Sequence, residues 1–207
     1  MNAIFSRLVV VLLGFGLGAT VTQAAPPILL QVDVSNPAAV TFTATSDFSY
    51  AVDSSFNLQE GIDLVSFFTA PLSGPGSTGT ISGSLATPSY PAYPYDYWSA
   101  DDRSGSFNQV DLNLYRATEG LNNPQIFSTT ANAFTGTSTI NLSSQVAYLP
   151  SLLGTTGNIV PGWGSMEPYT VIGQWQVVAI PEPTTLTLVG LGLLGVASMS
   201  SRFRRKV

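Results

Sequence analysis

Residues 30–44, LQVDVSNPAAVTFTA, contain two short runs in which apolar and polar residues alternate. The first run is Leu30–Val34 and the second is Val40–Ala44, and both are rich in β-branched or aromatic side chains. A period of two in such residues is typical of half-buried β-strands, because successive side chains of a strand point to opposite faces. We therefore predict two strands here.

The same alternation returns at residues 110–114, and more continuous apolar runs at 62–69, 126–130 and 170–180 predict central strands. No segment keeps a helical period between residues 25 and 180. About nine or ten strands separated by Gly- and Pro-rich turns predict an all-β domain over 25–179. We expect a single antiparallel β-sandwich, jelly-roll-like in topology. The alternative is disorder, because Ser, Gly and Pro are plentiful, but the in-phase apolar residues argue against it.

The composition excludes several classes of protein. The 207 residues include no Cys and no His, so disulfides, thiol or imidazole catalysis and Cys or His metal ligands are excluded. Twelve acidic residues against seven basic ones give a formal charge of −5, which argues against nucleic-acid binding. Five of the seven basic residues lie near the chain ends, and the acidic residues lie mostly between them. This distribution predicts a translocated domain with membrane-targeting ends.

Residues 1–24 have the layout of a secretory signal peptide. Arg7 supplies the positive charge, Leu8–Leu17 is apolar, and Thr22–Ala24 places small residues at a cleavage site. A retained N-terminal anchor is the alternative, but the apolar run is short for a membrane span. We predict that the segment directs export and is removed.

Residues 180–207 form a second targeting segment. It begins with Pro181, Glu182 and Pro183, continues with an uncharged run over 184–201, and ends in a basic tail. The basic residues of the tail are Arg202, Arg204, Arg205 and Lys206. A helix over the uncharged run would be about 27 Å long, close to the thickness of a bilayer core of about 30 Å. We predict one transmembrane helix with a cytoplasmic C-terminus and residues 25 to about 183 outside the inner membrane.

This order of Pro-Glu-Pro, a Gly/Leu-rich span and an Arg-rich end resembles the PEP-CTERM sorting signal of Gram-negative bacteria. The resemblance implies that Pro181, Glu182 and Pro183 are recognised by an exosortase, a transpeptidase-like membrane enzyme. It also implies an association with exopolysaccharide and biofilm matrix. Two prolines hold such a motif extended and accessible to an enzyme. The alternative is a plain membrane anchor whose prolines only begin the helix.

Residues 90–98, YPAYPYDYW, are the most aromatic stretch of the chain. Two prolines predict an extended loop, and ring faces on such a loop can stack on sugars while the Tyr hydroxyls form hydrogen bonds. The candidate glycan-binding residues are Tyr90, Tyr93, Tyr95, Tyr97 and Trp98. The alternative is that these rings cap one end of the core.

Asp101 and Asp102 are candidate calcium ligands, with Asp111 and Asn113 one strand further on. Calcium takes six to eight oxygen ligands, and loops of β domains often supply them. Alternatively, Arg103 pairs with a neighbouring carboxylate in this cluster. The carboxylates also leave open a polysaccharide hydrolase, although no spacing singles out an acid pair.

We conclude from the sequence that the chain is an exported surface or matrix protein with a structural or adhesive role linked to exopolysaccharide. Its expected partners are an exosortase-like enzyme, the inner membrane before processing, and exopolysaccharide. We expect neither enzymatic activity nor a cofactor. A calcium-dependent or glycan-binding module remains the alternative, and a carboxylate-dependent hydrolase is a further one.

Overall fold

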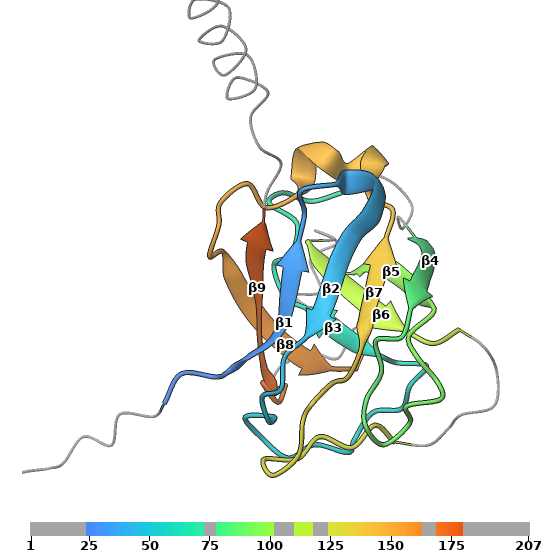
Figure 1. Ribbon diagram of the computed structural model, residues 1–207, viewed down its shortest axis with the longest axis vertical. Helices are drawn as coiled ribbons and strands as arrows, with labels where there is room; N and C mark the ends of the chain where they lie inside the picture. The colour runs from blue at the N-terminus through green and yellow to red at the C-terminus, as the bar shows by residue number, and fades with distance from the viewer. Residues whose placement is uncertain (1–23, 73–77, 102–109, 118–123, 163–168, 180–207) are drawn as a thin grey trace, which may run out of the picture.

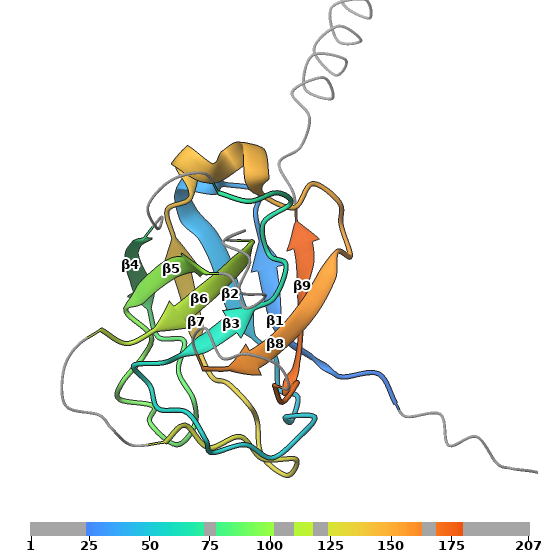
Figure 2. The same ribbon diagram turned by 180° about the vertical axis from the view of Figure 1, so that it is seen from behind.

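The computed structural model describes residues 24–72, 78–101, 110–117, 124–162 and 169–179. Within these ranges nine strands form a closed barrel with two short 3-10 helices at one end (Figures 1 and 2). The strands are β1 (Ile28–Asp33), β2 (Val40–Ala44), β3 (Ile62–Leu64), β4 (Thr78–Gly83), β5 (Tyr97–Asp101), β6 (Asp111–Tyr115), β7 (Thr137–Ile140), β8 (Thr156–Pro161) and β9 (Gly173–Ala179). The helices are η1 (Pro37–Ala39) and η2 (Ser143–Tyr148).

The barrel closes through its first and last strands. The order around the ring is β1-β2-β7-β4-β5-β6-β3-β8-β9, and β9 returns to β1. β1 and β9 are parallel, with Val32 beside Val177, whereas every other neighbouring pair is antiparallel. The all-β prediction therefore holds, but the antiparallel sandwich is wrong: the sheet is a single mixed barrel. Alternation in the sequence indicates which side chains are buried and does not reveal which strands pair.

The predicted targeting segments contribute nothing to the described fold. Residues 1–23 of the predicted signal peptide and all of 180–207 lie outside the described residues. Within the described part of the chain, no helix has the length and apolar character needed to cross a membrane. The predicted span over 184–201 lies outside the described residues.

The barrel interior is packed with aromatic and aliphatic side chains. The ring of Phe67 lies 5.8 Å from that of Phe42 and 5.3 Å from that of Trp175, measured between centroids. The indole of Trp175 is fully buried and donates a 3.2 Å hydrogen bond to the carbonyl oxygen of Val65. Packed aromatic rings of this size bury large apolar areas and add specific pair energies, so this cluster contributes to stability.

Strand β6 is buried on both faces. Asn113 is 1% exposed, and its side-chain amide donates to the carbonyl oxygens of Glu60 and Ile62 at 3.1 and 3.2 Å. Asp111 is also buried and accepts a 2.6 Å hydrogen bond from the backbone N–H of Ser66, which has a positive φ of 55°. Side-chain hydrogen bonds of this kind offset the cost of burying polar groups.

The two 3-10 helices lie together at the end of the barrel where β9 terminates (Figure 1). The backbone N–H of Leu142, just before η2, donates to the carbonyl oxygen of Pro37 in η1 at 2.8 Å. Asn36 caps η1 by accepting from the N–H of Ala38 at 3.1 Å. The opposite end is formed by longer loops (Figure 2).

Candidate functional site

The structure separates the five aromatic residues of 90–98 into buried and exposed rings. Tyr95 and Trp98 are 1% and 3% exposed, and Tyr90 packs partly buried against the core. Tyr93 and Tyr97 are 40% and 38% exposed. Tyr97 and Trp98 are consecutive residues of β5, so their side chains point to opposite faces of the sheet. Only Tyr93 and Tyr97 of this set therefore present a large ring surface to solvent.

Tyr95 anchors the segment from inside. Its hydroxyl donates a 2.5 Å hydrogen bond to the side-chain oxygen of Gln125. The amide of Gln125 donates in turn to the carbonyl oxygens of Asn57 and Gly61 at 2.9 and 2.7 Å. Burial raises the pKa of the Tyr95 phenol far above its ordinary value. Tyr95 therefore holds the segment in place and remains protonated.

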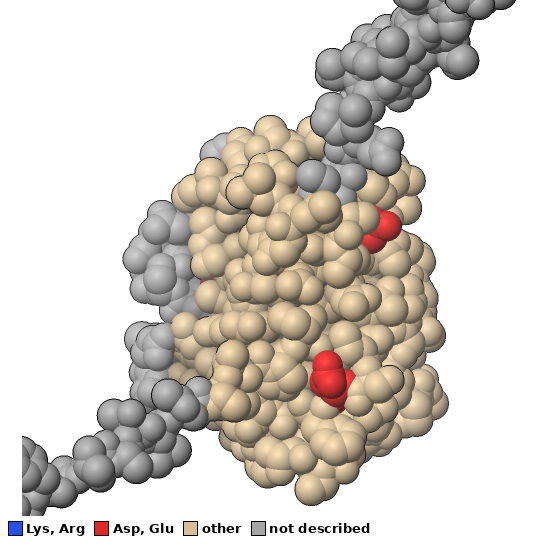
Figure 3. All heavy atoms as spheres, turned by 60° about the vertical axis from the view of Figure 1, so that its left-hand side comes forward, with Lys and Arg blue, Asp and Glu red and all other residues tan. Residues whose placement is uncertain are grey.

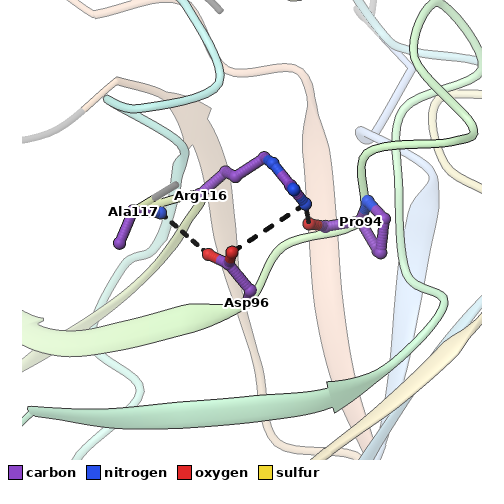
Figure 4. A network of polar contacts seen from close by, with 4 residues as sticks. All are labelled: Pro94, Asp96, Arg116 and Ala117. Atoms are coloured by element: carbon purple, nitrogen blue, oxygen red, sulfur yellow. Dashed lines mark hydrogen bonds and ion pairs between the residues drawn. The ribbon is translucent and has the colours of Figure 1, made fainter. Parts of the chain in front are cut away.

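Arg116 anchors the segment from outside (Figure 4). Its Nη1 donates a 2.9 Å hydrogen bond to the carbonyl oxygen of Pro94 and lies 3.8 Å from a carboxylate oxygen of Asp96. The other carboxylate oxygen of Asp96 accepts from the backbone N–H of Ala117 at 2.8 Å. The guanidinium carbon also lies 5.4 Å from the centroid of the Tyr93 ring, a cation–π distance. These contacts hold the exposed ring of Tyr93 against Arg116, which directly follows β6.

Tyr97 and Tyr115 form an aromatic pair on the outer face of the barrel. They are cross-strand partners on β5 and β6, and their ring centroids are 6.2 Å apart. Partial burial, then the neighbouring Tyr97 and Asp96, raise the pKa of the Tyr115 phenol. On the other side of β5, Thr80 of β4 is the cross-strand partner of Tyr97. The exposed rings are therefore continuous with the surface of β4.

A cleft opens beside this surface, between β4 and η2. β4 pairs with β5 through residues 78–80 and with β7 through residues 81–83, so among the described residues its first half has no strand partner on the β7 side. The cavity in this gap has a volume of about 470 Å³. It is lined by Thr78, Gly79, Thr80, Trp98, Asn141, Ser143, Ser144 and Gln145. None of these lining residues is charged.

Trp98 forms the aromatic part of the cleft. Its indole lies against Gly79, so close that a Cβ atom at position 79 would be 2.5 Å from Nε1. The indole N–H donates no hydrogen bond to any residue that the structure describes. The cleft thus combines a nearly buried indole with hydroxyl and amide groups, a set chemically suited to polar, uncharged ligands.

The predicted calcium ligands Asp101 and Asp102 lie largely outside the described residues. Asp101 and Asp111 are cross-strand partners on β5 and β6, but the side chain of Asp101 and all of Asp102 lie outside the description. Within the described ranges there is no group of three or more acidic residues that could hold a metal ion. The sorting residues Pro181, Glu182, Pro183, Arg202, Arg204, Arg205 and Lys206 also lie outside the described residues.

Comparison with known proteins identifies the C-terminal segment. Residues 179–205 match the PEP-CTERM protein-sorting motif. The resemblance inferred from Pro181, Glu182 and Pro183 is thereby confirmed: the chain carries a PEP-CTERM protein-sorting motif. The motif implies an exported protein that is anchored in the membrane before processing and is sorted by an exosortase-type enzyme. No significant similarity to a curated protein or to a solved structure was found.

Most residues of the cleft were not predicted from the sequence. Trp98 was, but the polar residues around it come from separate segments, 78–80 and 141–145. Taken alone, each segment has the composition of an ordinary turn or strand. Only the pairing of β4 with both β5 and β7 brings them together.

Proposed function

We propose that the barrel is a non-enzymatic structural or adhesive module that acts at the cell surface or in an exopolysaccharide matrix. The observation that carries this proposal is the uncharged, hydroxyl- and ring-bearing surface formed by the cleft and by Tyr97 and Tyr115. Neutral polysaccharides offer hydroxyl groups and apolar ring faces. Amides, hydroxyls and aromatic rings are the protein groups that match them.

The charge distribution supports the same function. Among the described residues Arg116 is the single basic residue, and its guanidinium is already engaged by Pro94 and Asp96. The face shown in Figure 3 is almost entirely uncharged, with a few acidic groups. A surface of this kind lacks the cationic clusters that bind nucleic acids or strongly acidic polymers.

The position of the sorting motif is consistent with this function. β9 ends at Ala179, which is also the first residue of the matched motif. Every strand of the barrel therefore ends at or before the first residue of the motif, so processing within 180–207 leaves the barrel complete. An exported module of this kind reaches the compartment in which exopolysaccharide is found.

Retention on exopolysaccharide tests the proposal. The exported protein is purified from the producing cells and passed over their own immobilised exopolysaccharide. We expect wild-type protein to be retained and the variant with Tyr93→Ser and Tyr97→Ser to be retained less. Val178→Ser is the matched control, because Val178 is 42% exposed on β9. Wild-type protein that passes through without delay would refute the proposal.

The non-enzymatic part of the proposal has its own assay. Incubation of the protein with the same polysaccharide is expected to release no reducing ends. Release that is lost on substitution of one carboxylate would instead establish the hydrolase alternative.

A further inference from the structure

We infer that the cleft beside Trp98 is a binding site for one or two units of an uncharged saccharide. The inference deepens the proposed matrix function and rests on it for the choice of ligand class. The cavity of about 470 Å³ falls within the range of small-ligand pockets, which is about 300–1,000 Å³. It is open to solvent along the side of η2, where Ser143 and Ser144 are exposed.

The cleft holds hydrogen-bond donors that the fold leaves unused. The side-chain oxygen of Asn141 accepts from the hydroxyl and the backbone N–H of Ser143 at 2.8 and 3.0 Å. The side-chain oxygen of Gln145 accepts from the hydroxyl of Ser144 at 2.9 Å. The nitrogens of both amides donate to no described residue, and the same holds for the indole nitrogen of Trp98. Three side chains that line one cavity thus carry N–H groups with no acceptor among the described residues.

Sugar hydroxyls are suitable partners for these donors. Each hydroxyl accepts from an N–H while donating to an acceptor such as Thr78 or Thr80, which also line the cavity. The local hydrogen bonds fix the amides of Asn141 and Gln145 before a ligand arrives. Such preorganisation reduces the entropy lost on binding.

A charged ligand fits the cleft less well. No lining residue carries a charge, so a carboxylate or an ammonium group would lose hydration without gaining a counter-charge. Thr80 also lies beside the exposed ring of Tyr97, its cross-strand partner. A neutral chain bound in the cleft can therefore continue over the outer face of β5.

The test follows the indole N–H of Trp98 by NMR in the ¹⁵N-labelled exported protein. The chain has three Trp residues, and Trp98→Phe assigns the signal. The probes are maltotriose, cellotriose, mannotriose and xylotriose, with trigalacturonate as the acidic counterpart. Ser144→Arg obstructs the cleft, and Thr129→Arg makes the same charge change at an exposed residue that does not line the cleft.

We expect at least one neutral trisaccharide to shift the Trp98 signal and to leave that of Trp175, whose N–H is bonded to Val65, in place. Ser144→Arg should weaken this binding about tenfold or more, and Thr129→Arg should not. No shift with any neutral probe, an equal affinity in Ser144→Arg, or tighter binding of trigalacturonate would each overturn the inference.

The exopolysaccharide column separates this inference from the proposed function. If Ser144→Arg leaves retention on the column unchanged, the inference that the cleft binds saccharide is refuted, but the proposed matrix function is not. Trisaccharide binding at Trp98 without retention on the native polymer would refute the matrix function alone.

Discussion

The hydroxyl of Tyr95 donates a 2.5 Å hydrogen bond to the side-chain oxygen of Gln125, and both side chains are buried. Gln125 also donates to the carbonyl oxygens of Asn57 and Gly61. This pair of side chains thus links three loop segments that are distant in the sequence: the segment that contains Tyr95, the segment that contains Gln125, and the segment 57–61. The exposed rings of Tyr93 and Tyr97 are presented from this anchored segment.

Tyr95→Phe is expected to lower the free energy of unfolding by about 1–3 kcal/mol, because the buried oxygen of Gln125 loses its donor. Urea denaturation of the exported protein measures the change. Tyr97→Phe is the control: its ring is 38% exposed, and its loss of a hydroxyl should cost less than about 0.5 kcal/mol. Equal effects of the two substitutions would contradict the anchoring role of Tyr95.

Alkaline pH is expected to destabilise the barrel. Phenols of the unfolded chain ionise near pH 10, whereas burial raises the pKa of Tyr95 in the folded state. The Tyr95 phenol then loses its proton more readily in the unfolded chain than in the folded one. Tyr95 therefore leaves the free energy of unfolding unchanged below about pH 10 and lowers it above that pH. The pKa of Tyr115 is raised in the same direction. Melting temperatures between about pH 8 and 11 should fall less steeply for Tyr95→Phe, and an identical slope would contradict this assignment.

Phe67→Ala is expected to cost about 3–5 kcal/mol, because it opens a cavity among Phe42, Phe68 and Trp175. Val52→Ala provides the comparison, since Val52 is 69% exposed and should change stability by less than about 0.5 kcal/mol. Chemical denaturation of both variants tests the prediction. A small loss for Phe67→Ala would show that the barrel interior repacks.

Arg116→Lys is expected to make the segment 90–98 more mobile around Tyr93, with little effect on global stability. Lysine keeps the charge but lacks the planar group that contacts the Tyr93 ring and the carbonyl oxygen of Pro94. Hydrogen exchange should accelerate at the N–H of Ala117, which is bonded to the carboxylate of Asp96. The free energy of unfolding should change by less than about 1 kcal/mol, because the ion pair is partly exposed. Unchanged exchange at Ala117 would show that Arg116 does not order this loop.

Replacement of Pro181, Glu182 and Pro183 by alanine is expected to block processing of the exported chain. These residues lie within the matched sorting motif, and an alanine segment loses the extended shape that proline imposes. Intact-mass measurement should find unprocessed protein in the membrane fraction and less processed protein at the cell surface or in the medium. Thr129→Ala, far outside the motif, should be processed normally. Normal processing of the alanine variant would show that these three residues are not needed for processing.

The sequence predicted strands best where alternation was strict. Runs 30–34, 40–44 and 110–114 coincide largely with β1, β2 and β6. The apolar run 62–69 contributes only the three residues of β3, because the chain turns at Ser66 and directs Phe67 and Phe68 into the core. The run 126–130 takes part only in an isolated bridge between Phe127 and Asp53.

The closure of the barrel could not be predicted from these patterns. Pairing of β1 with β9 joins residues that are more than a hundred positions apart, and a sandwich would show the same alternation. The site was only partly predictable for a similar reason. Trp98 stood out by its aromatic neighbours, whereas Asn141 and Gln145 become neighbours of Trp98 only through the pairing of β4.

The parallel pairing of β1 and β9 has a mechanical consequence. The C-terminal end of β9 leads directly to the sorting motif, so a pull on the chain from the motif would act along β9. Force in that direction loads the hydrogen bonds from β9 to β1 and β8 in shear, and they share the load instead of unzipping one after another. Extraction of β9 from its C-terminal end would therefore require the hydrogen bonds to both neighbouring strands to break together.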